Sequence, residues 1–377
     1  NGMQSIFVIK PSLYKYSGQT GSLPKFYYSV NEMGEIWFGG TKCKLDSVLF
    51  FPLEKKEETD SFNVVVIADP QTRDSTELSY FREGILTDLS KIEVDFGIAL
   101  GDIMYDDLSL LPYYLETISI LPYPLFHVPG NHDMDYGDHD DSVSLITYSK
   151  YLSPGYYAFQ EGKVTFIILD DIEWLGAKDN KTGNYRGMIG KDQLNWVKEL
   201  LGHIEDDNLL VLCFHIPLWY REQDEHVNVA DAQELFSLLE ERKYLLALAG
   251  HMHFIERVYL GSQQGWDGTA EFLHLTAAAA SGSWWKGPKD NKGIPVSEQR
   301  DGSPKGYHLI SFSGNSYTDS FFPAGTANDH QLRISEPLDK EYSGNKEGIP
   351  LLVNFFNGDK YSEVSWSIDD NQWKQAV

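Results

Sequence analysis

The chain has 377 residues, a length typical of two or three domains. Hydrophobic residues make up 42% of it and aromatic residues 14%, so the chain can bury a substantial core and global disorder is excluded. Its 31 Lys and Arg against 56 Asp and Glu give a net charge of −25, which disfavours binding to polymeric nucleic acid or to an anionic membrane surface. Any phosphate that the protein binds therefore needs a local source of positive charge.

Residues 1–60 contain short apolar or aromatic runs separated by Gly and Pro, which predicts an N-terminal β domain. The charged stretch 54–60 predicts a linker or exposed loop at its end. The chain starts with Asn1 and not with Met, so we expect that an upstream segment was removed, together with any export signal. No apolar run approaches the roughly 18 residues of a membrane span, so no transmembrane segment is predicted.

Between residues 61 and 276, short apolar strands alternate with amphipathic helices. The predicted strands are 62–68, 96–100, 125–128, 164–169, 209–214 and 244–249, and the predicted helices are 75–89, 193–201 and 229–239. This alternation predicts a layered α/β domain, in which active sites gather at the carboxyl ends of the strands. From residue 277 to 377, Gly, Pro, Ser and aromatic residues dominate, which predicts a C-terminal β domain.

Side chains of the kinds that bind metals directly follow five of these strands. They are Asp69, Asp102, the pair Asn131 and His132, His215, and the pair His251 and His253. Carboxylate, amide and imidazole ligands suit Zn, Mn or Fe, and one carboxylate can bridge two ions about 3.5–4 Å apart. A water held between two such ions becomes a nucleophile at neutral pH. The strand ends therefore predict a hydrolytic two-metal site.

Each of these residues, taken singly, has a structural explanation as well. Asp69 suits a helix N-cap or a turn, the segment 130–133 suits a turn, and a lone His215 suits a histidine packed in the core. The segment 250–253, Gly-His-Met-His, is the strongest single indication of metal binding, because two His two positions apart in an extended chain point the same way. The ordered set at five strand ends favours the metal site over separate structural explanations.

In this order the motifs resemble those of the calcineurin-like metallophosphoesterases, which read Asp-x-His, Gly-Asp-x-x-Asp, Gly-Asn-His-Asp/Glu, His and Gly-His-x-His. The resemblance covers Asp69 to His253, and the flanks resemble the β domains of a bacterial, usually exported, group of the family. It implies a four-layer αββα metallophosphoesterase sandwich, an α/β fold, with flanking small all-β domains. It also implies an exported location (periplasmic, surface or secreted) with the leader missing from this chain; a cytoplasmic location stays open.

The resemblance further implies a role for each strand-end residue and for a cofactor of two divalent or trivalent metal ions, Mn, Zn or Fe. It assigns Asp69 and His253 to the first metal, Asp102 to both, and Asn131, His215 and His251 to the second. It places His132 beside the leaving-group oxygen, as general acid or as a donor to the phosphoryl oxygens of the transition state. Asp106 or Asp133 would orient His132.

Two positions depart from the family pattern. Gln71 stands where the family has His, and Tyr105 stands where it has the second carboxylate, with the acid one residue later at Asp106. Purple acid phosphatases, a branch of the same superfamily, also lack this histidine and place a ligating tyrosine three residues after the bridging Asp. Tyr105 is therefore either a ligand to Fe(III) or an aromatic side chain packed at the strand end, and Gln71 is an alternative amide ligand. The metal identity stays open.

A Gly- and Ser-rich segment near residue 284 offers a candidate substrate-binding surface. Its Trp284, Trp285 and Lys286 can form one wall of a substrate pocket, because exposed indoles on such a loop make a recognition surface. Packing of the two indoles between the central and C-terminal domains is the alternative. Asn131 and His132 complete the expected contacts to substrate.

The sequence thus predicts a metal-dependent phosphoesterase, a hydrolase acting on phosphoric ester bonds. A hydroxide bridging the two metals attacks a phosphomonoester or a phosphodiester, and His132 assists the leaving group. The negative charge favours a small phosphoester substrate over a nucleic acid polymer. The alternative is a catalytically weak or silent binding protein of the same fold with structural metals. Gln71 favours that alternative, whereas the intact set of second-metal ligands opposes it, and the oligomeric state is not predicted.

Overall fold

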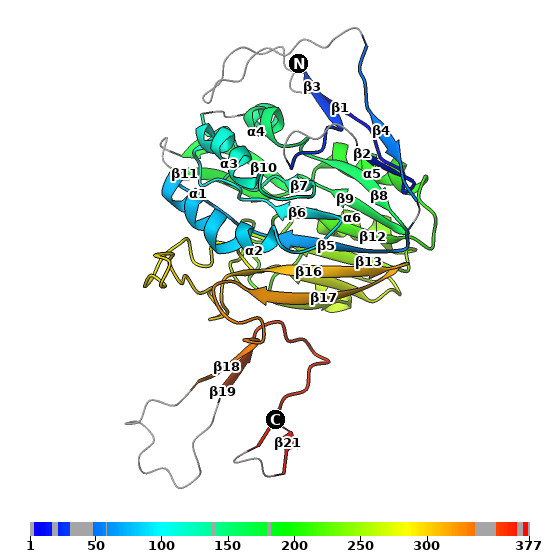
Figure 1. Cartoon of the computed structure of the whole chain (residues 1–377). Helices are drawn as coiled ribbons and strands as arrows, with labels where there is room; N and C mark the ends of the chain where they lie inside the picture. The colour runs from blue at the N-terminus through cyan, green and yellow to red at the C-terminus, as the bar shows by residue number, and fades with distance from the viewer. Residues whose placement is uncertain are drawn as a thin grey trace.

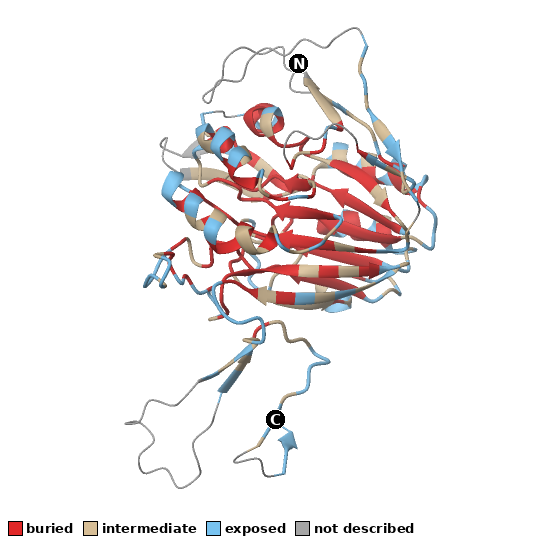
Figure 2. Cartoon of the chain, in the orientation of Figure 1, coloured by how far each residue is buried: buried red, intermediate tan, exposed pale blue. Residues whose placement is uncertain are grey.

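Two β-sheets stacked face to face form the centre of the molecule, and helices cover their outer faces (Figure 1). The structure, a computed structural model, describes residues 4–16, 22–30, 48–57, 59–137, 140–178, 182–335, 352–367 and 372–375. Buried residues are concentrated in the strands of the two sheets and on the inward sides of the helices (Figure 2). The arrangement confirms the predicted layered α/β fold.

The first sheet has five strands in the order β17-β16-β5-β6-β7. Their bounds are β5 (Ser61–Ile67), β6 (Phe96–Leu100), β7 (Leu125–Val128), β16 (Gly306–Ser313) and β17 (Ser316–Pro323). Strands β5, β6 and β7 run parallel, whereas β16 is antiparallel to β5, with Ile310 opposite Val64. Residues 306–323, which the sequence assigns to the C-terminal β domain, therefore complete a sheet that begins with β5.

The second sheet has six strands in the order β14-β15-β13-β12-β9-β8. Their bounds are β8 (Tyr157–Glu161), β9 (Val164–Ile168), β12 (Leu209–Cys213), β13 (Leu245–Ala249), β14 (Glu256–Leu260) and β15 (Phe272–Thr276). The four inner strands run parallel, and β8 and β14 are antiparallel edge strands. The carboxyl ends of β12 and β13 therefore lie together at one edge of this sheet.

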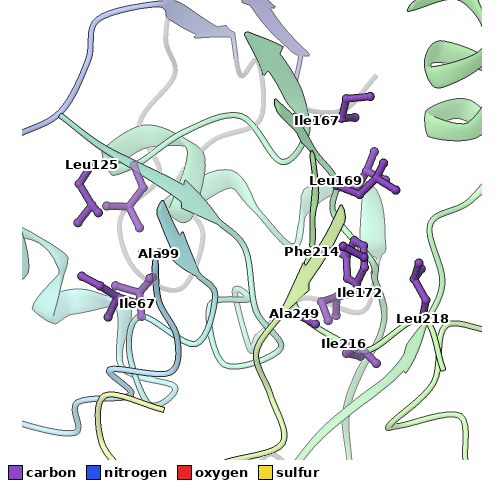
Figure 3. Packing of buried hydrophobic residues seen from close by; sticks show 14 of the residues in the cluster. Ile67, Ala99, Leu125, Ile167, Leu169, Ile172, Phe214, Ile216, Leu218 and Ala249 are labelled. Carbon is purple, nitrogen blue, oxygen red and sulfur yellow. The ribbon is translucent and has the colours of Figure 1, made fainter. Parts of the chain in front are cut away.

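The parallel strands are apolar throughout because both of their faces are buried. Along β5, Val64 and Val66 belong to the core between the sheets, whereas Val65 and Ile67 belong to the core under the helices. This alternation follows from the two-residue period of a strand. Figure 3 shows the outer core, with Ile67, Ala99 and Leu125 of the first sheet among its labelled residues. Each inner strand thus contributes to two hydrophobic layers.

Six α-helices flank the sheets or cover loops. They are α1 (Ser75–Phe81), α2 (Thr87–Leu89), α3 (Leu111–Ile118), α4 (Ile146–Tyr151), α5 (Lys191–Leu201) and α6 (Ala232–Leu239) among the described residues. A π-helical segment, Arg82–Leu86, joins α1 to α2, so the predicted helix 75–89 is one continuous helical stretch. Asp74 caps its start by accepting hydrogen bonds from the backbone N–H groups of Thr76 and Glu77.

Short two-stranded pairs surround this centre. They are β1 (Gln4–Phe7) with β3 (Tyr27–Val30), β2 (Tyr14–Tyr16) with β4 (Leu53–Lys55), β10 (Ile172–Lys178) with β11 (Thr182–Gly187), β18 (Leu332–Ser335) with β19 (Leu352–Phe355), and β20 (Ser365–Trp366) with β21 (Lys374–Gln375). Residues 31–47 of the predicted N-terminal β domain lie outside the described residues. In the described ranges, no helix has the length and apolar character that crossing a membrane requires.

Candidate metal centre

The carboxyl ends of five parallel strands, three from one sheet and two from the other, meet at one edge of the sandwich. They bring together all six predicted metal ligands: Asp69 after β5, Asp102 after β6, Asn131 after β7, His215 after β12, and His251 and His253 after β13. Asp102 Oδ1 lies 3.2 Å from His215 Nε2, and Asp69 Oδ1 lies 3.6 Å from His253 Nε2. The two sheets therefore share one cluster of carboxylates and imidazoles.

The backbone at these strand ends adopts the left-handed conformation unusually often. Nine described non-glycine residues have positive φ: Asp69, Gln71, Asp102, Asp106, His251, His253, Trp284, Trp285 and Ser297. All but Ser297 belong to the candidate residues of the sequence. Such conformations cost roughly 1–3 kcal/mol each and persist where the surrounding structure enforces them. Here they turn the chain sharply after β5, β6 and β13 and direct the side chains into the cluster.

Each of the three cluster histidines donates one ring N–H to a backbone carbonyl. His215 Nδ1 lies 2.7 Å from Leu100 O, His251 Nε2 lies 2.9 Å from His226 O, and His253 Nδ1 donates to Gly282 O. A carbonyl oxygen only accepts, so these nitrogens carry the protons. In the neutral rings the other nitrogens then present lone pairs to the cluster, as in histidines that ligate metals.

Two of these nitrogens face each other, since His215 Nε2 lies 3.2 Å from His251 Nδ1. Two buried amide oxygens in the same cluster, Gln71 Oε1 and Asn131 Oδ1, have no hydrogen-bond partner. The amide nitrogen of Gln71 donates to Asp102 Oδ2 at 3.1 Å, which leaves its oxygen as the free end. Unpaired buried acceptors are costly, and metal ions bound in the cluster would give these atoms partners.

The electrostatics of the cluster also favour a cation. Burial opposes a charge on His215, but the carboxylate of Asp102 outweighs burial and raises the pKa of His215 to about 10. Burial raises the pKa of Asp69 to about 7 and lowers the pKa of His251 to about 3. Ligand atoms of Asp102, His215 and His251 lie within 4.8 Å of one another. The donor set of carboxylates, imidazoles and amide oxygens thus fits metal ions.

His132 lies beside the cluster, held by a carboxylate on one side and an aromatic ring on the other. Its Nδ1 is 2.5 Å from Asp106 Oδ1, and its Nε2 is 4.0 Å from Asp102 Oδ2. The Tyr105 ring stacks on it, with centroids 4.7 Å apart. Burial disfavours the imidazolium, but the carboxylates of Asp102 and Asp106 prevail and raise the pKa of His132 to about 9. His132 is therefore prepared to hold a proton at Nε2.

Asp133, the second residue that the sequence offers as an orienting group for His132, has a different position. Its buried carboxylate accepts hydrogen bonds from the backbone N–H groups of Ile103, Met104 and Gly130. Asp133 thus ties the loop after β7 to the loop after β6. Of these two acids, Asp106 is the one in contact with the His132 ring.

The three residues predicted to form a wall of the substrate pocket, Trp284, Trp285 and Lys286, do not share one environment. Trp285 is 4% exposed and donates from Nε1 to Pro70 O, so it packs under the loop that follows β5. Trp284 stacks on His253 with centroids 4.6 Å apart, and Lys286 Nζ lies 5.3 Å from the centre of the Trp284 ring. Trp284 and Lys286 therefore border the cluster, and Trp285 is the anchor beneath them.

Sequence reasoning missed two residues that support the cluster. The buried carboxylate of Asp171 accepts hydrogen bonds from the N–H groups of His215 and Ile216. Asp171 follows β9 closely, as the predicted ligands follow their strands, so a search for polar residues after buried strands could have found it. Arg300 donates its backbone N–H to His253 O at 2.8 Å, and its place in an irregular loop gave no such signal.

Comparisons with known proteins agree with this geometry. A family model described as calcineurin-like phosphoesterase matches residues 62–254, and one described as C terminal of calcineurin-like phosphoesterase matches residues 274–377. A protein of Arcobacter nitrofigilis, called probable glycerophosphodiester phosphodiesterase GpdQ, is 27% identical over 236 residues, which are 58% of this chain and 78% of the relative.

Two solved structures share the fold at low sequence identity. Purple acid phosphatase PPD1 from yellow lupin (Lupinus luteus) seeds aligns with a TM-score of 0.52 and 14% identity, over 71% of this chain and 52% of its own. PhoD aligns with a TM-score of 0.51 and 11% identity, over 82% of this chain and 75% of its own. The chain spans about half the length of the lupin protein, so this likeness concerns the fold alone.

Proposed function

Since the chain belongs to the calcineurin-like phosphoesterase family and is thereby a metal-dependent hydrolase of phosphoric esters, we propose that it acts through two metal ions and that His132 assists the leaving group. The family match confirms the family and the enzyme class predicted from the motifs. The number of ions, the ligand roles and the substrate are the parts proposed.

The proposed ligand sets follow the grouping of the side chains. Asp69, Gln71 and His253 would hold one ion, Asn131, His215 and His251 would hold the other, and Asp102 would contribute to both. When bound, the ions supply Lewis acidity, which neutralises phosphoryl charge and lets water attack phosphorus at neutral pH. In a chain with net charge −25 they also provide the positive charge that a phosphate needs.

One observation carries this proposal. His215 Nε2 and His251 Nδ1 face each other at 3.2 Å, and two amide oxygens of the predicted ligands, Gln71 Oε1 and Asn131 Oδ1, are buried without partners. In a folded protein without a metal ion, the buried His215 must hold a second proton and the two amide oxygens stay unpaired, and both conditions are unfavourable. A purely structural metal would also give these atoms a partner. However, a structural role does not explain why Asp106 holds a protonated His132 at the edge of the cluster.

His132 performs the proton transfer in the proposed reaction. His132 donates from Nδ1 to Asp106 Oδ1, which fixes the ring and stabilises the imidazolium, and the second proton of the imidazolium is on Nε2 on the side of the cluster. From there the proton passes to the oxygen of the departing alcohol as the ester bond breaks. Asn131 and His132 also contact the phosphoryl oxygens in this arrangement.

Between the two departures from the family pattern, the geometry favours Gln71 as a ligand. Its buried Oε1 is without a partner, whereas the Tyr105 ring is stacked between His132 and the guanidinium of Arg73, which lies 5.7 Å from the ring centre. We therefore assign Tyr105 to the orientation of His132, and expect the metal-loaded protein to lack the visible charge-transfer band of a tyrosinate bound to Fe(III).

The first test is hydrolysis of p-nitrophenyl phosphate and bis(p-nitrophenyl) phosphate by protein purified without chelator. The name of the Arcobacter relative makes the phosphodiester the first substrate to try. Asn131→Ala and His132→Asn should each lower kcat by roughly 10²–10⁴-fold. Asn131→Ala should lose metal as well, whereas His132→Asn should keep the metal content of the wild type.

His203→Asn is the matched control, because His203 is exposed between α5 and β12 and far from the cluster in the fold. It should retain full activity. If metal-loaded wild type hydrolyses neither ester nor other small phosphoesters, the proposal is wrong and the alternative of a silent binding protein with structural metals takes its place.

A further inference from the structure

Two cations of the loop 281–300 lie over one indole ring at the edge of the metal cluster. Lys286 Nζ is 5.3 Å and Arg300 Cζ is 5.4 Å from the centre of the Trp284 ring. Both side chains are exposed. In the described part of the chain neither has an ion pair with a carboxylate, although the protein carries 56 acidic residues. The pair is therefore a local concentration of positive charge.

The acidic residues near this loop are engaged elsewhere. Asp290 accepts hydrogen bonds from the backbone of Lys292 and Ile294, and Glu298 pairs with Arg333. Asp301, the direct neighbour of Arg300, accepts from the backbone N–H groups of Ile255 and Ser303. These contacts leave both cations available to an anion from outside the protein.

The position of the two cations relates them to the reacting centre. The Trp284 ring stacks on the ring of His253, and Arg300 is tied to His253 through its backbone N–H. Next to Arg300 lies a cavity of about 370 Å³, whose lining includes the aromatic rings of Tyr220 and Phe254. The cations therefore lie one indole away from the proposed first metal, and the cavity beside Arg300 has room for part of a ligand.

The loop that carries them is held in a strained and well-anchored shape. Trp284 and Trp285 have φ of +62° and +51°, and a Cβ at Gly282 would lie 1.7 Å from Ser297 O, so only glycine fits there. The buried Lys305 secures the return of the loop by donating to backbone carbonyls at Pro295 and Val296. A rigid cationic surface of this kind loses little entropy when an anion binds.

We propose that Lys286 and Arg300 bind a second anionic group of the substrate, a phosphate or a carboxylate carried by the part that does not react. The substrate class is then a phosphoester whose leaving group bears a further negative charge, with Trp284 packing against the segment between the two anions. This inference rests on the proposed function, since it names the substrate class of the same site.

The test compares three aryl phosphates that differ at a group insulated from the ester by a methylene. They are 4-(carbamoylmethyl)phenyl, 4-(carboxymethyl)phenyl and 4-(phosphonomethyl)phenyl phosphate. The wild type should prefer the two charged esters to the neutral amide in kcat/KM by about 10-fold or more, because hydrogen bonds to charged groups are the strong ones. A larger gain for the phosphonate assigns the subsite to phosphate, and equal gains assign it to carboxylates as well.

In the double variant Lys286→Gln/Arg300→Gln, the preference in kcat/KM for the charged esters over the amide ester should fall to near one. Lys289→Gln is the matched control, since Lys289 lies on the same loop but donates to the Tyr80 hydroxyl. If the double variant still prefers the charged esters to the amide ester, the proposal is wrong. It is also wrong if the control loses this preference to the same extent.

Calorimetric titration with the corresponding non-hydrolysable arylphosphonates separates this inference from the function on which it rests. Tighter binding of the charged ligands by the wild type, lost in the double variant, supports the subsite even if no ester is hydrolysed. In that case the proposed function fails alone. Equal binding of charged and neutral arylphosphonates by the wild type overturns the subsite.

Discussion

The geometry of the metal cluster is set as much by backbone conformation as by side-chain type. Asp69, Asp102, His251 and His253 all adopt positive φ directly after their strands. In a strand, successive side chains point to opposite faces of the sheet. A residue with positive φ interrupts this pattern, so its side chain can point into the cluster and not to a face of the sheet. The strain, roughly 1–3 kcal/mol for each residue, is sustained by the buried strands on either side.

Gly130→Ala tests this dependence at a single atom. A Cβ at Gly130 would lie 2.2 Å from the backbone nitrogen of Asp102 and 2.4 Å from its Oδ1, so the shared carboxylate must move. We expect the variant to fold, with an unchanged far-ultraviolet circular dichroism spectrum, and to bind less metal by about 10–100-fold in affinity. Metal affinity measured by competition with a chelator checks this.

Gly202→Ala is the control, because Gly202 ends α5 with helical φ and a Cβ there would be 3.3 Å from Glu199 O. It should bind metal as the wild type does. Full metal affinity in Gly130→Ala would show that the close packing of the loops after β6 and β7 does not position Asp102.

For single residues, the sequence predicted those whose function is indicated by their immediate neighbours in the chain. A polar side chain directly after a buried strand marks Asp69, Asp102 and His215, because the register of a short strand fixes where it ends. Arg300 was missed because its place over Trp284 depends on a long irregular loop. The separate environments of Trp284 and Trp285 were equally hidden, since both residues have the same side chain and opposite orientations.

Among the elements, β16 shows how the first sheet is closed by a strand from far along the chain. Its His308 donates from Nδ1 to Asp319 Oδ1 on β17 at 2.9 Å, and Asp319 Oδ2 pairs with Arg257 of β14 at 2.6 Å. Asn357 donates to the same carboxylate. Asp319 thus links the edges of the two sheets and the chain that follows β19.

Asp319→Asn should destabilise the fold in a pH-dependent way. Burial opposes the charge of Asp319, but His308, Asn357 and Arg257 prevail and lower its pKa. Its contribution is therefore complete above the unfolded pKa of about 4 and is lost as the pH falls through the lower folded value. At pH 7 the variant should lose about 1–3 kcal/mol of unfolding free energy, because His308 and Arg257 lose their charged acceptor and Arg257 keeps only Asp359 as a carboxylate partner.

Urea unfolding of both proteins at pH 7 and at pH 3 measures this loss, and the difference should be smaller at pH 3. Asp207→Asn is the control, since its ion pair with Lys163 lies at the surface, where such a pair contributes little to stability, and it should change stability by less than about 1 kcal/mol at both pH values. A difference that is constant with pH would contradict the role of the charged Asp319.

The helices and strands were predicted where apolar residues recur with the period of a helix or a strand within the element itself. The strands 96–100 and 125–128 were predicted with the bounds that the structure gives to β6 and β7. The helix 75–89 was also predicted, but its π-helical segment at 82–86 was not, because a shift from i−4 to i−5 bonding leaves the pattern of buried residues almost unchanged. The pairing of β16 with β5 joins segments more than 240 residues apart, and no local pattern encodes it.

The whole molecule combines a strongly negative surface with a buried cluster that favours cations. The cluster draws ligands from both sheets, so a bound ion links the two halves of the sandwich. Because the unfolded chain does not assemble these ligands, metal binding stabilises the folded state alone. The stability of the protein and the occupancy of its site are therefore expected to depend on each other.

Chelation should reveal this link as a lower melting temperature. EDTA at a concentration that strips the metal should lower Tm by several degrees, and the shift should be smaller in Asn131→Ala, which lacks one ligand. Differential scanning calorimetry with and without EDTA measures both. Identical Tm values for stripped and loaded wild type would contradict the coupling between the site and the fold.

The most direct test of the two-metal phosphoesterase is the metal content of fully active protein, measured by mass spectrometry of the elements per chain. The account predicts about two ions per chain, a loss of the second-site ion in Asn131→Ala, and hydrolysis that rises in proportion to occupancy. Full phosphoesterase activity with one ion or none per chain would contradict it.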